Sequence, residues 1–203
     1  MKNLYNKNIS GVGYLGEGKY NRKDYFKIYY IWTQMLQRCY NPYCINKHPT
    51  YKDCYVCEEW HCFQNFAKWY EDNYYEVPNE EMCLDKDILF KGNKIYSPKT
   101  CIIVPKRINS LFVKSNNLRG KYPIGVVYDK ERNNLRVYCN ICENKKNKTK
   151  SLGRFPLNRP FQAFTCYKQF KENYIKQVAE EYKEFIPIEL YNAMYNYQIE
   201  IND

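Results

Sequence analysis

The sequence has no long apolar run and very little histidine. No apolar stretch approaches the roughly 20 residues that a membrane-spanning helix needs, so we expect no membrane partner. The first residues, MKNLYNKNIS, lack the apolar core of a signal peptide, and we therefore expect a cytoplasmic protein. Internal repeats are absent. The two histidines, His48 and His61, leave few candidates for an imidazole base.

The composition is typical of a folded, basic protein. Hydrophobic residues make up 44% of the 203 residues and aromatic residues 18%, so long disordered segments are not expected. The net charge of +10 favours a polyanionic partner. Most of this charge is local, because residues 115–160 contain eleven Lys or Arg against three Asp or Glu. We expect the ten cysteines to be buried thiols, metal ligands or reactive groups, because no signal for secretion is found.

The pattern of elements predicts an α+β protein with two domains, residues 1–114 and residues 115–203. The segment SNNLRGKYP contains the Asn, Gly and Pro of a linker and marks the boundary. The first half has an apolar helical stripe from about Tyr25 and a second helix in EEWHCFQNFAKWYED. Short strands follow, in CLDKDILF and YSPKTCIIVP, and then a short helix, KRINSLFVK.

The second half is predicted to form three strands and a helix. In LRVYCNIC, apolar residues alternate with Arg136, Tyr138 and Asn140, so these three should lie on one exposed face. The segment ENKKNK predicts a basic turn, and TKSLGRF the third strand. An exposed sheet face of this kind, flanked by lysines, can bind phosphates and read base edges in the major groove of DNA. A solvated basic face is the structural alternative.

The strings GVVYDKERNNLRVYC, SLGRFP and FQAFTCYKQF resemble the Apetala-two (ethylene-response-factor type) DNA-binding domain, especially its phage versions. Gly125, Val126, Leu152, Gly153 and Phe155 match the family pattern. The resemblance implies a three-stranded antiparallel sheet that packs on a helix and enters the major groove of double-stranded DNA. The expected DNA-binding residues are Arg132, Arg136, Tyr138, Asn140, Lys145, Lys146, Lys148, Thr149, Lys150 and Ser151.

The first half carries several separated motifs in order: YYIWTQMLQRCYNP, YKDCYVCEEW, FQNFAKW and LDKDILFKGNKIYSPKTCIIVP. Over most of residues 10–112 it resembles a family of phage proteins that are similar to His-Asn-His (HNH) nucleases. Many of these proteins pair this module with an Apetala-two domain, as relatives of homing endonucleases do. The resemblance implies a ββα-containing module.

HNH catalysis needs a histidine base and a divalent metal ion, Mg²⁺ or Mn²⁺. By the resemblance, Asp85 precedes the position of the base, Asn93 lies in the loop, and Asn109 lies where the motif contacts metal. Lys86 occupies the position of the base, and a lysine is a poor base at neutral pH unless it is desolvated. Asp87, on the same strand face as Asp85, is a candidate metal ligand or replacement base. A surface ion pair at the strand end is the structural alternative.

Four cysteines are candidates for a structural zinc site. Cys54 and Cys57 have the spacing of a zinc knuckle, and Cys39 and Cys101 lie in the flanking motifs. One zinc ion bound by these four thiolates would stabilise a small module directly. Cysteine is also common as a buried apolar residue, and Cys39 lies on the apolar stripe of its helix.

Three hypotheses follow for the whole chain. The first is a phage-type protein that binds double-stranded DNA and carries a degenerate nuclease-like module. The second is a metal-dependent DNA endonuclease or nickase that uses Asp85, Asp87, Asn93 and Asn109. The third is a phage anti-defence protein in which both modules bind a host protein or a ribonucleoprotein. Steep salt dependence of DNA binding would distinguish the first from the third.

Overall fold

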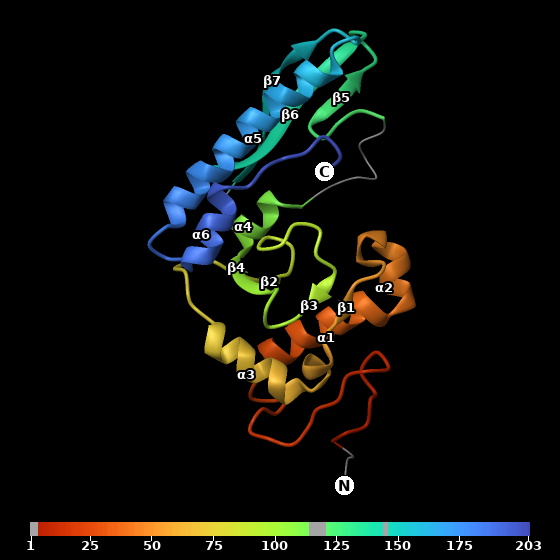
Figure 1. The fold of residues 1–203 in the computed structure, drawn as a ribbon, viewed down its shortest axis with the longest axis vertical. Helices are drawn as coiled ribbons and strands as arrows, with labels where there is room; N and C mark the ends of the chain where they lie inside the picture. The colour runs from red at the N-terminus through yellow and green to blue at the C-terminus, as the bar shows by residue number, and fades with distance from the viewer. Residues whose placement is uncertain (1–3, 114–120, 144–145) are drawn as a thin grey trace. The chain divides into compact units, whose positions relative to one another are not determined.

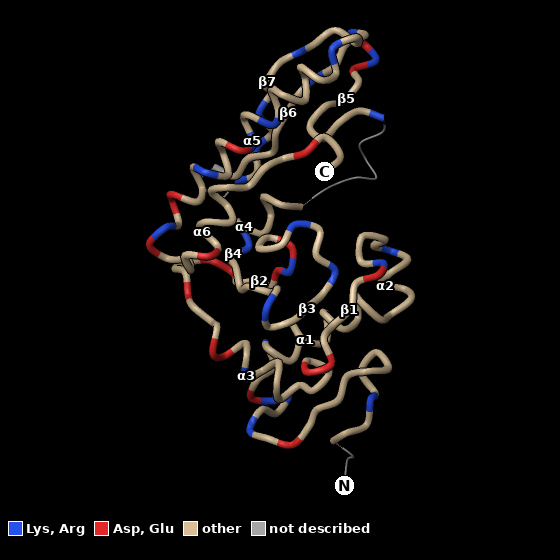
Figure 2. The backbone as a smooth tube through the Cα atoms, in the orientation of Figure 1, with Lys and Arg blue, Asp and Glu red and all other residues tan. Residues whose placement is uncertain are grey.

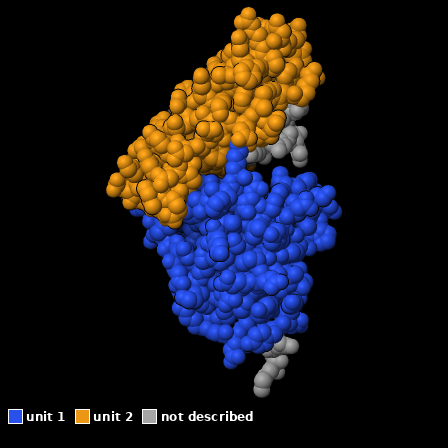
Figure 3. Space-filling model, in the orientation of Figure 1, with its two compact units in different colours: residues 1–105 blue, residues 106–203 orange. Residues whose placement is uncertain are grey.

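The computed structural model describes residues 4–113, 121–143 and 146–203. It has the mixed helix and strand content of an α+β protein, as expected. The chain divides into two compact units, residues 1–105 and 106–203, which are called unit 1 and unit 2 below (Figure 3). The division falls earlier than the expected boundary after residue 114.

Two aromatic-rich helices contribute much of the buried core of unit 1. The helical segments described in this unit are α1 (Phe26–Tyr40), α2 (Pro42–Lys47), α3 (Phe63–Asn73) and the 3-10 turns η1 (Pro49–Tyr51) and η2 (Glu58–His61). The apolar stripes of α1 and α3 are buried as the helical periodicity predicts: Trp32, Met35, Leu36, Cys39, Phe63, Phe66, Ala67 and Tyr70. The Trp32 indole donates a hydrogen bond to the Trp60 carbonyl at 2.7 Å, which ties α1 to η2.

Short strands form two small sheets in unit 1. Strand β1 (Tyr55–Val56) pairs in parallel with β3 (Ile95–Tyr96). Strand β2 (Met82–Asp85) pairs antiparallel with β4 (Ile102–Pro105). The loop after β2 returns the chain to β3 and contains the residues that the sequence singles out as nuclease-like.

Unit 2 is a three-stranded antiparallel sheet packed on a long helix. Its described elements are α4 (Lys106–Leu111), β5 (Val126–Asp129), β6 (Asn134–Glu143), β7 (Lys146–Phe155), α5 (Pro160–Tyr182) and α6 (Ile188–Tyr195). The strand order is β5-β6-β7, and α5 runs along one face of the sheet (Figure 1). The expected sheet and helix are therefore confirmed.

Helix α4 belongs to unit 2 because its side chains contact the last helices. The Arg107 guanidinium forms an ion pair with Glu181 on α5 at 2.7 Å. Phe112, just after α4, packs edge-on against Tyr197 with ring centroids 4.7 Å apart. The short helix that ends the expected N-terminal module is thus part of the C-terminal unit.

Strand β6 is much longer than its neighbour β5. The pairing of β5 with β6 runs only from Val126 opposite Val137 to Asp129 opposite Asn134. The edge of β6 over residues 138–143 consequently has no strand partner on the β5 side among the described residues. Gly125 sets the start of β5. Its φ is +79°, and a Cβ at this position would lie 2.1 Å from the Tyr167 ring.

None of the helices within residues 4–113, 121–143 and 146–203 is long and apolar enough to cross a membrane.

Candidate nucleic-acid interface

The outward face of the unit 2 sheet brings the predicted polar residues of β6 together. Leu135 and Val137 are fully buried beneath the sheet, where α5 packs. The intervening Arg136 and Asn140 are exposed, and Tyr138 is half-buried, as strand alternation predicts. The Arg136 guanidinium lies over the Tyr138 ring at 5.4 Å from its centroid, a cation–π geometry that holds the arginine on this face.

Strand β7 extends the same face. Ser151 lies opposite Tyr138, and Thr149 lies opposite Asn140, so their side chains project to the same side as their partners. The Thr149 hydroxyl donates to Asn140 Oδ1 at 2.9 Å, and the Asn140 amide NH₂ makes no hydrogen bond with another described residue. The structure thus places Arg136, Tyr138, Asn140, Thr149 and Ser151 side by side.

The predicted basic turn is wrong in its extent. Strand β7 begins at Lys146, so Lys146, Lys148 and Lys150 are strand residues rather than turn residues. Lys148 and Lys150 lie opposite the buried Ile141 and Cys139 and therefore start from the helix side of the sheet. The Lys150 amine lies 4.9 Å from the Phe170 ring centroid on α5.

These three lysines are nevertheless exposed. Figure 2 marks the Lys and Arg positions of unit 2 in blue along the backbone. Their side chains leave the edge strand β7 on the helix side of the sheet and do not belong to the outward face. The predicted Lys145 lies outside the described residues.

The turn between β5 and β6 carries one predicted residue and reveals one that sequence reasoning missed. Arg132 is exposed, and its backbone N–H donates to Asp129 Oδ1 at 3.3 Å. Arg154 on β7 lies opposite Arg136 and pairs with the Asp129 carboxylate, which lowers the pKa of that carboxyl. Arg154 thereby links β7 to β5 across the face and neutralises an acidic group there. The alternation of residues along the third strand could have identified Arg154 as a residue of this face.

In unit 1, Asp85 holds the turn that follows β2. Its Oδ1 accepts hydrogen bonds from the backbone N–H groups of Asp87 and Ile88, both at 2.7 Å. Burial raises the pKa of the Asp85 carboxyl, although these two bonds act in the opposite direction. This carboxylate therefore organises the local backbone.

Lys86 is buried, with 7% of its side chain exposed, and is fully engaged in this loop. Its amine donates to Asp87 Oδ2 at 2.7 Å and to the Asn93 carbonyl at 2.8 Å, and it lies 5.7 Å from the Tyr96 ring centroid. The Asn93 amide in turn donates to the carbonyls of Lys86 at 2.8 Å and Ile95 at 2.7 Å. Hydrogen bonds between Lys86 and Asn93 thus connect the two ends of the loop between β2 and β3.

This arrangement does not fit a divalent metal ion. The Asp87 carboxylate faces the Lys86 ammonium, and Asp85 Oδ1 is occupied by backbone donors. A cation at this point would meet the positive charge of Lys86. Asn109, the remaining predicted catalytic residue, is half-buried on α4 in unit 2.

The ten cysteines are free thiols. Burial raises the pKa of Cys39 and of Cys101 to about 12 in each case, and it also raises the pKa of Cys54 and Cys57. Within the described part of the chain, no group of three or more His, Cys, Asp or Glu side chains could hold a metal ion. The four-cysteine zinc site stays a prediction.

Comparison of the chain with protein-family models, with curated proteins and with solved structures finds no match.

Proposed function

We propose that this protein binds double-stranded DNA through the outward face of the unit 2 sheet. The observation that carries the proposal is the row of Arg136, Tyr138, Asn140, Thr149 and Ser151 on one open face of two antiparallel strands. A two-stranded ribbon fits the major groove, whose width is about 12 Å. The lysines of β7 are exposed on the edge strand of the same sheet, where long basic side chains can reach the phosphates on either side of the groove.

The side chains on this face suit base recognition. Arg136 presents a planar donor fork, which pairs with the two major-groove acceptors of guanine. Asn140 accepts from Thr149 through Oδ1, so it presents its NH₂ donor to a base or a phosphate oxygen. The Arg154–Asp129 pair removes a negative charge that would repel the DNA backbone.

A salt titration with charge-matched variants tests the proposal. Binding of a 20-base-pair duplex is followed by fluorescence anisotropy from about 50 to 200 mM salt, and log affinity should fall steeply and linearly with log salt. Replacing Lys146, Lys148 and Lys150 by Ala should make this slope shallower by about 0.9 for each phosphate contact removed. Replacing the exposed Lys23, Lys47 and Lys52 of unit 1 by Ala makes the same change in net charge and should leave the slope unchanged.

Equal slopes for the two triple variants would contradict the proposed interface. Salt-independent association, or capture of a protein instead of the duplex, would favour the host-partner hypothesis.

For unit 1 we propose a nuclease-like scaffold that does not cleave DNA. The support is the engagement of Lys86 with Asp87 and Asn93, which leaves no free base in the loop. Supercoiled plasmid incubated with Mg²⁺ or Mn²⁺ should stay supercoiled, as it does with chelator. Metal-dependent nicking that disappears in Asp85→Ala would establish the nickase hypothesis instead.

A further inference from the structure

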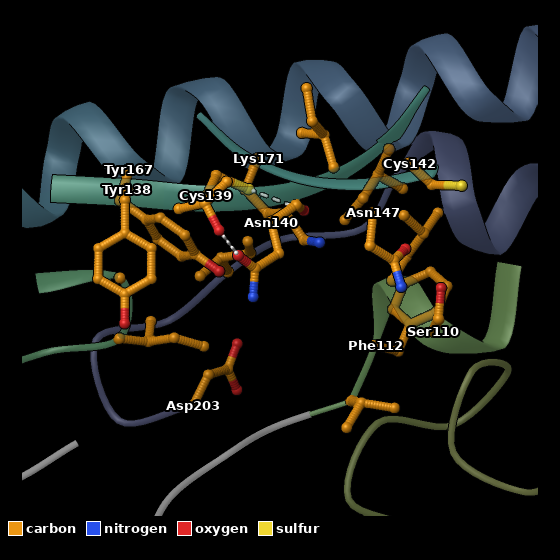
Figure 4. Close-up of a pocket in the computed structure, with 18 of the residues that line it drawn as sticks. Ser110, Phe112, Tyr138, Cys139, Asn140, Cys142, Asn147, Tyr167, Lys171 and Asp203 are labelled. Atoms are coloured by element: carbon orange, nitrogen blue, oxygen red, sulfur yellow. Dashed lines mark hydrogen bonds between the residues drawn. The ribbon is translucent and has the colours of Figure 1, made fainter. Parts of the chain in front are cut away.

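A cavity of about 650 Å³ lies in unit 2, at the open edge of β6 (Figure 4). It is bounded by the start of β5, the second half of β6, α5, the segment after α4 and the segment after α6. The volume falls in the range of about 300–1,000 Å³ that is typical of small-molecule sites. Its wall combines apolar residues such as Phe112 and Ile175 with a small set of polar groups.

Lys171 is the unusual member of this wall. It is only 8% exposed, and no hydrogen bond or ion pair joins its amine to another described residue. Its neighbours are the Tyr174 ring, at 5.9 Å from the amine, and the Cys139 thiol. Burial raises the pKa of Cys139, so the thiol is neutral and does not compensate the ammonium. A buried cation without a counter-charge is costly, and a bound anion would remove the cost.

The polar groups beside Lys171 also donate hydrogen bonds. On the β5 side of β6, the Tyr138 N–H donates to the Gly125 carbonyl at 3.2 Å, and the Cys142 N–H donates to the Tyr174 hydroxyl at 2.8 Å. By strand alternation, the Asn140 N–H between them points to the same edge, and no partner for it is found among the described residues.

We propose that this cavity binds a small organic oxyanion, a carboxylate or a phosphate monoester with an aromatic or apolar body. Lys171 is the counter-ion, the Asn140 backbone N–H donates to an oxygen of the ligand, and the apolar wall holds the body of the ligand. Lys148 adds positive charge to the wall, whereas Asp203 lines the cavity with a carboxylate, so the ligand carries its charge at one end. This site does not depend on DNA binding.

The test uses the full chain and probes that differ only in the charged group. Benzoate, phenyl phosphate and the neutral benzamide are titrated by saturation-transfer NMR. Benzoate or phenyl phosphate should bind saturably, and benzamide at least tenfold more weakly. Lys171→Met should abolish the binding of the anions. Lys176→Met, which removes a lysine of the same helix that does not line the cavity, should retain it.

Methionine matches the length of the lysine stem, and a circular-dichroism melt checks that both variants fold. The proposal is overturned if neither anion binds, if benzamide binds as tightly as benzoate, or if Lys171→Met binds benzoate like the original chain. Loss of binding in Lys176→Met to the same degree would overturn it too, because the effect would then follow general charge rather than the cavity.

Discussion

Among the residues that the structure describes, each unit buries one lysine, and the surroundings of the two amines differ. Lys86 in unit 1 is 6% exposed and Lys171 in unit 2 is 8% exposed. The amine of Lys86 is hydrogen-bonded to a carboxylate and a carbonyl, whereas the amine of Lys171 makes no hydrogen bond or ion pair with another described residue and lies near the Tyr174 ring and the Cys139 thiol. The first arrangement satisfies a buried charge with fixed partners, and the second leaves the charge uncompensated beside a cavity.

Because their partners differ, we expect Lys86 to have a structural role and Lys171 a role in ligand binding. A satisfied buried charge stabilises the loop that supplies its partners, and its removal leaves those partners unpaired. An unsatisfied buried charge stabilises nothing in the unliganded protein, and for this reason Lys171 is the centre of the ligand site that we propose. The position that the nuclease resemblance assigns to the base is therefore part of the framework, and the lysine that no motif singled out is the better site candidate.

The largest expected effect compares two glycines with the same backbone conformation, one in each unit. Gly92 and Gly125 both have φ near +79°, but a Cβ at Gly92 meets no atom within 4 Å, whereas at Gly125 it meets the Tyr167 ring at 2.1 Å. Gly92→Ala should cost about 1 kcal/mol of stability from backbone strain alone. Gly125→Ala should cost about 4 kcal/mol, because the clash with Tyr167 adds to that strain.

Urea denaturation of both variants, followed by far-ultraviolet circular dichroism, measures these costs. Similar losses for the two variants would mean that the Tyr167 ring gives way, and the start of β5 would then not be fixed by this contact.

The next effect tests the role of Lys86. Lys86→Met should destabilise unit 1 by about 3 kcal/mol, because the Asn93 carbonyl and the Asp87 carboxylate lose their donor. Asp87→Asn should cost less, about 1–2 kcal/mol, because the buried Lys86 amine loses its counter-charge while the Asn oxygen can still accept its hydrogen bond. Thermal unfolding followed by the fluorescence of Trp32, Trp60 and Trp69, all in unit 1, reads this unit selectively. A Lys86→Met variant as stable as the original chain would remove the distinction between the two lysines.

Much of the fold could be predicted from the sequence because apolar periodicity is strong. The stripes that contain Trp32 and Phe63, and the alternation around Val137, identify helices and a strand that the structure contains. The start of β7 could not be predicted in this way. The segment from Lys146 to Lys150 is polar on both faces, and it is a strand because it pairs with β6.

In the candidate sites, too, some features could be predicted from the sequence and others could not. The face with Arg136 and Asn140 follows from alternation alone. The partners of Lys86 are set by the path of the loop, because a backbone carbonyl seven residues away leaves no signal in the sequence. Lys171 could have been found, since it is four residues after Tyr167 and three before Tyr174, on the buried side of α5. A lysine at a core position of a helical stripe is the signal for such a site.

A further prediction is that the affinity for duplex DNA depends on the outward face of the unit 2 sheet. Arg136→Ala should weaken duplex binding by about 2 kcal/mol, or roughly 30-fold, if the guanidinium contacts a base. Arg159→Ala removes the same charge from an exposed position before α5 and should weaken binding less than threefold. Fluorescence anisotropy at fixed salt measures both. An equal loss in the two variants would indicate a diffuse charge effect without base reading.

The smallest expected effect concerns Lys171 in the absence of ligand. Burial lowers the pKa of this amine below its ordinary value of 10.5, and the same amine regains that value in the unfolded chain. The unfolded state thus binds more protons than the folded state between the lowered pKa and 10.5, so stability should rise with pH across this window. Lys171→Met should be about 1 kcal/mol more stable at pH 7, and its advantage should shrink as the pH approaches 10.5.

Paired urea denaturation curves of Lys171→Met and the original chain, from pH 7 to pH 10, measure this difference. The other groups at the cavity, Cys139, Lys148, Tyr167, Tyr174 and Asp203, titrate in both proteins and largely cancel in the comparison. Lower stability of Lys171→Met at pH 7 would mean that the lysine is satisfied in the unliganded protein. The two buried lysines would then have the same role, and the argument that Lys171 marks a ligand site would fail together with the contrast between the units.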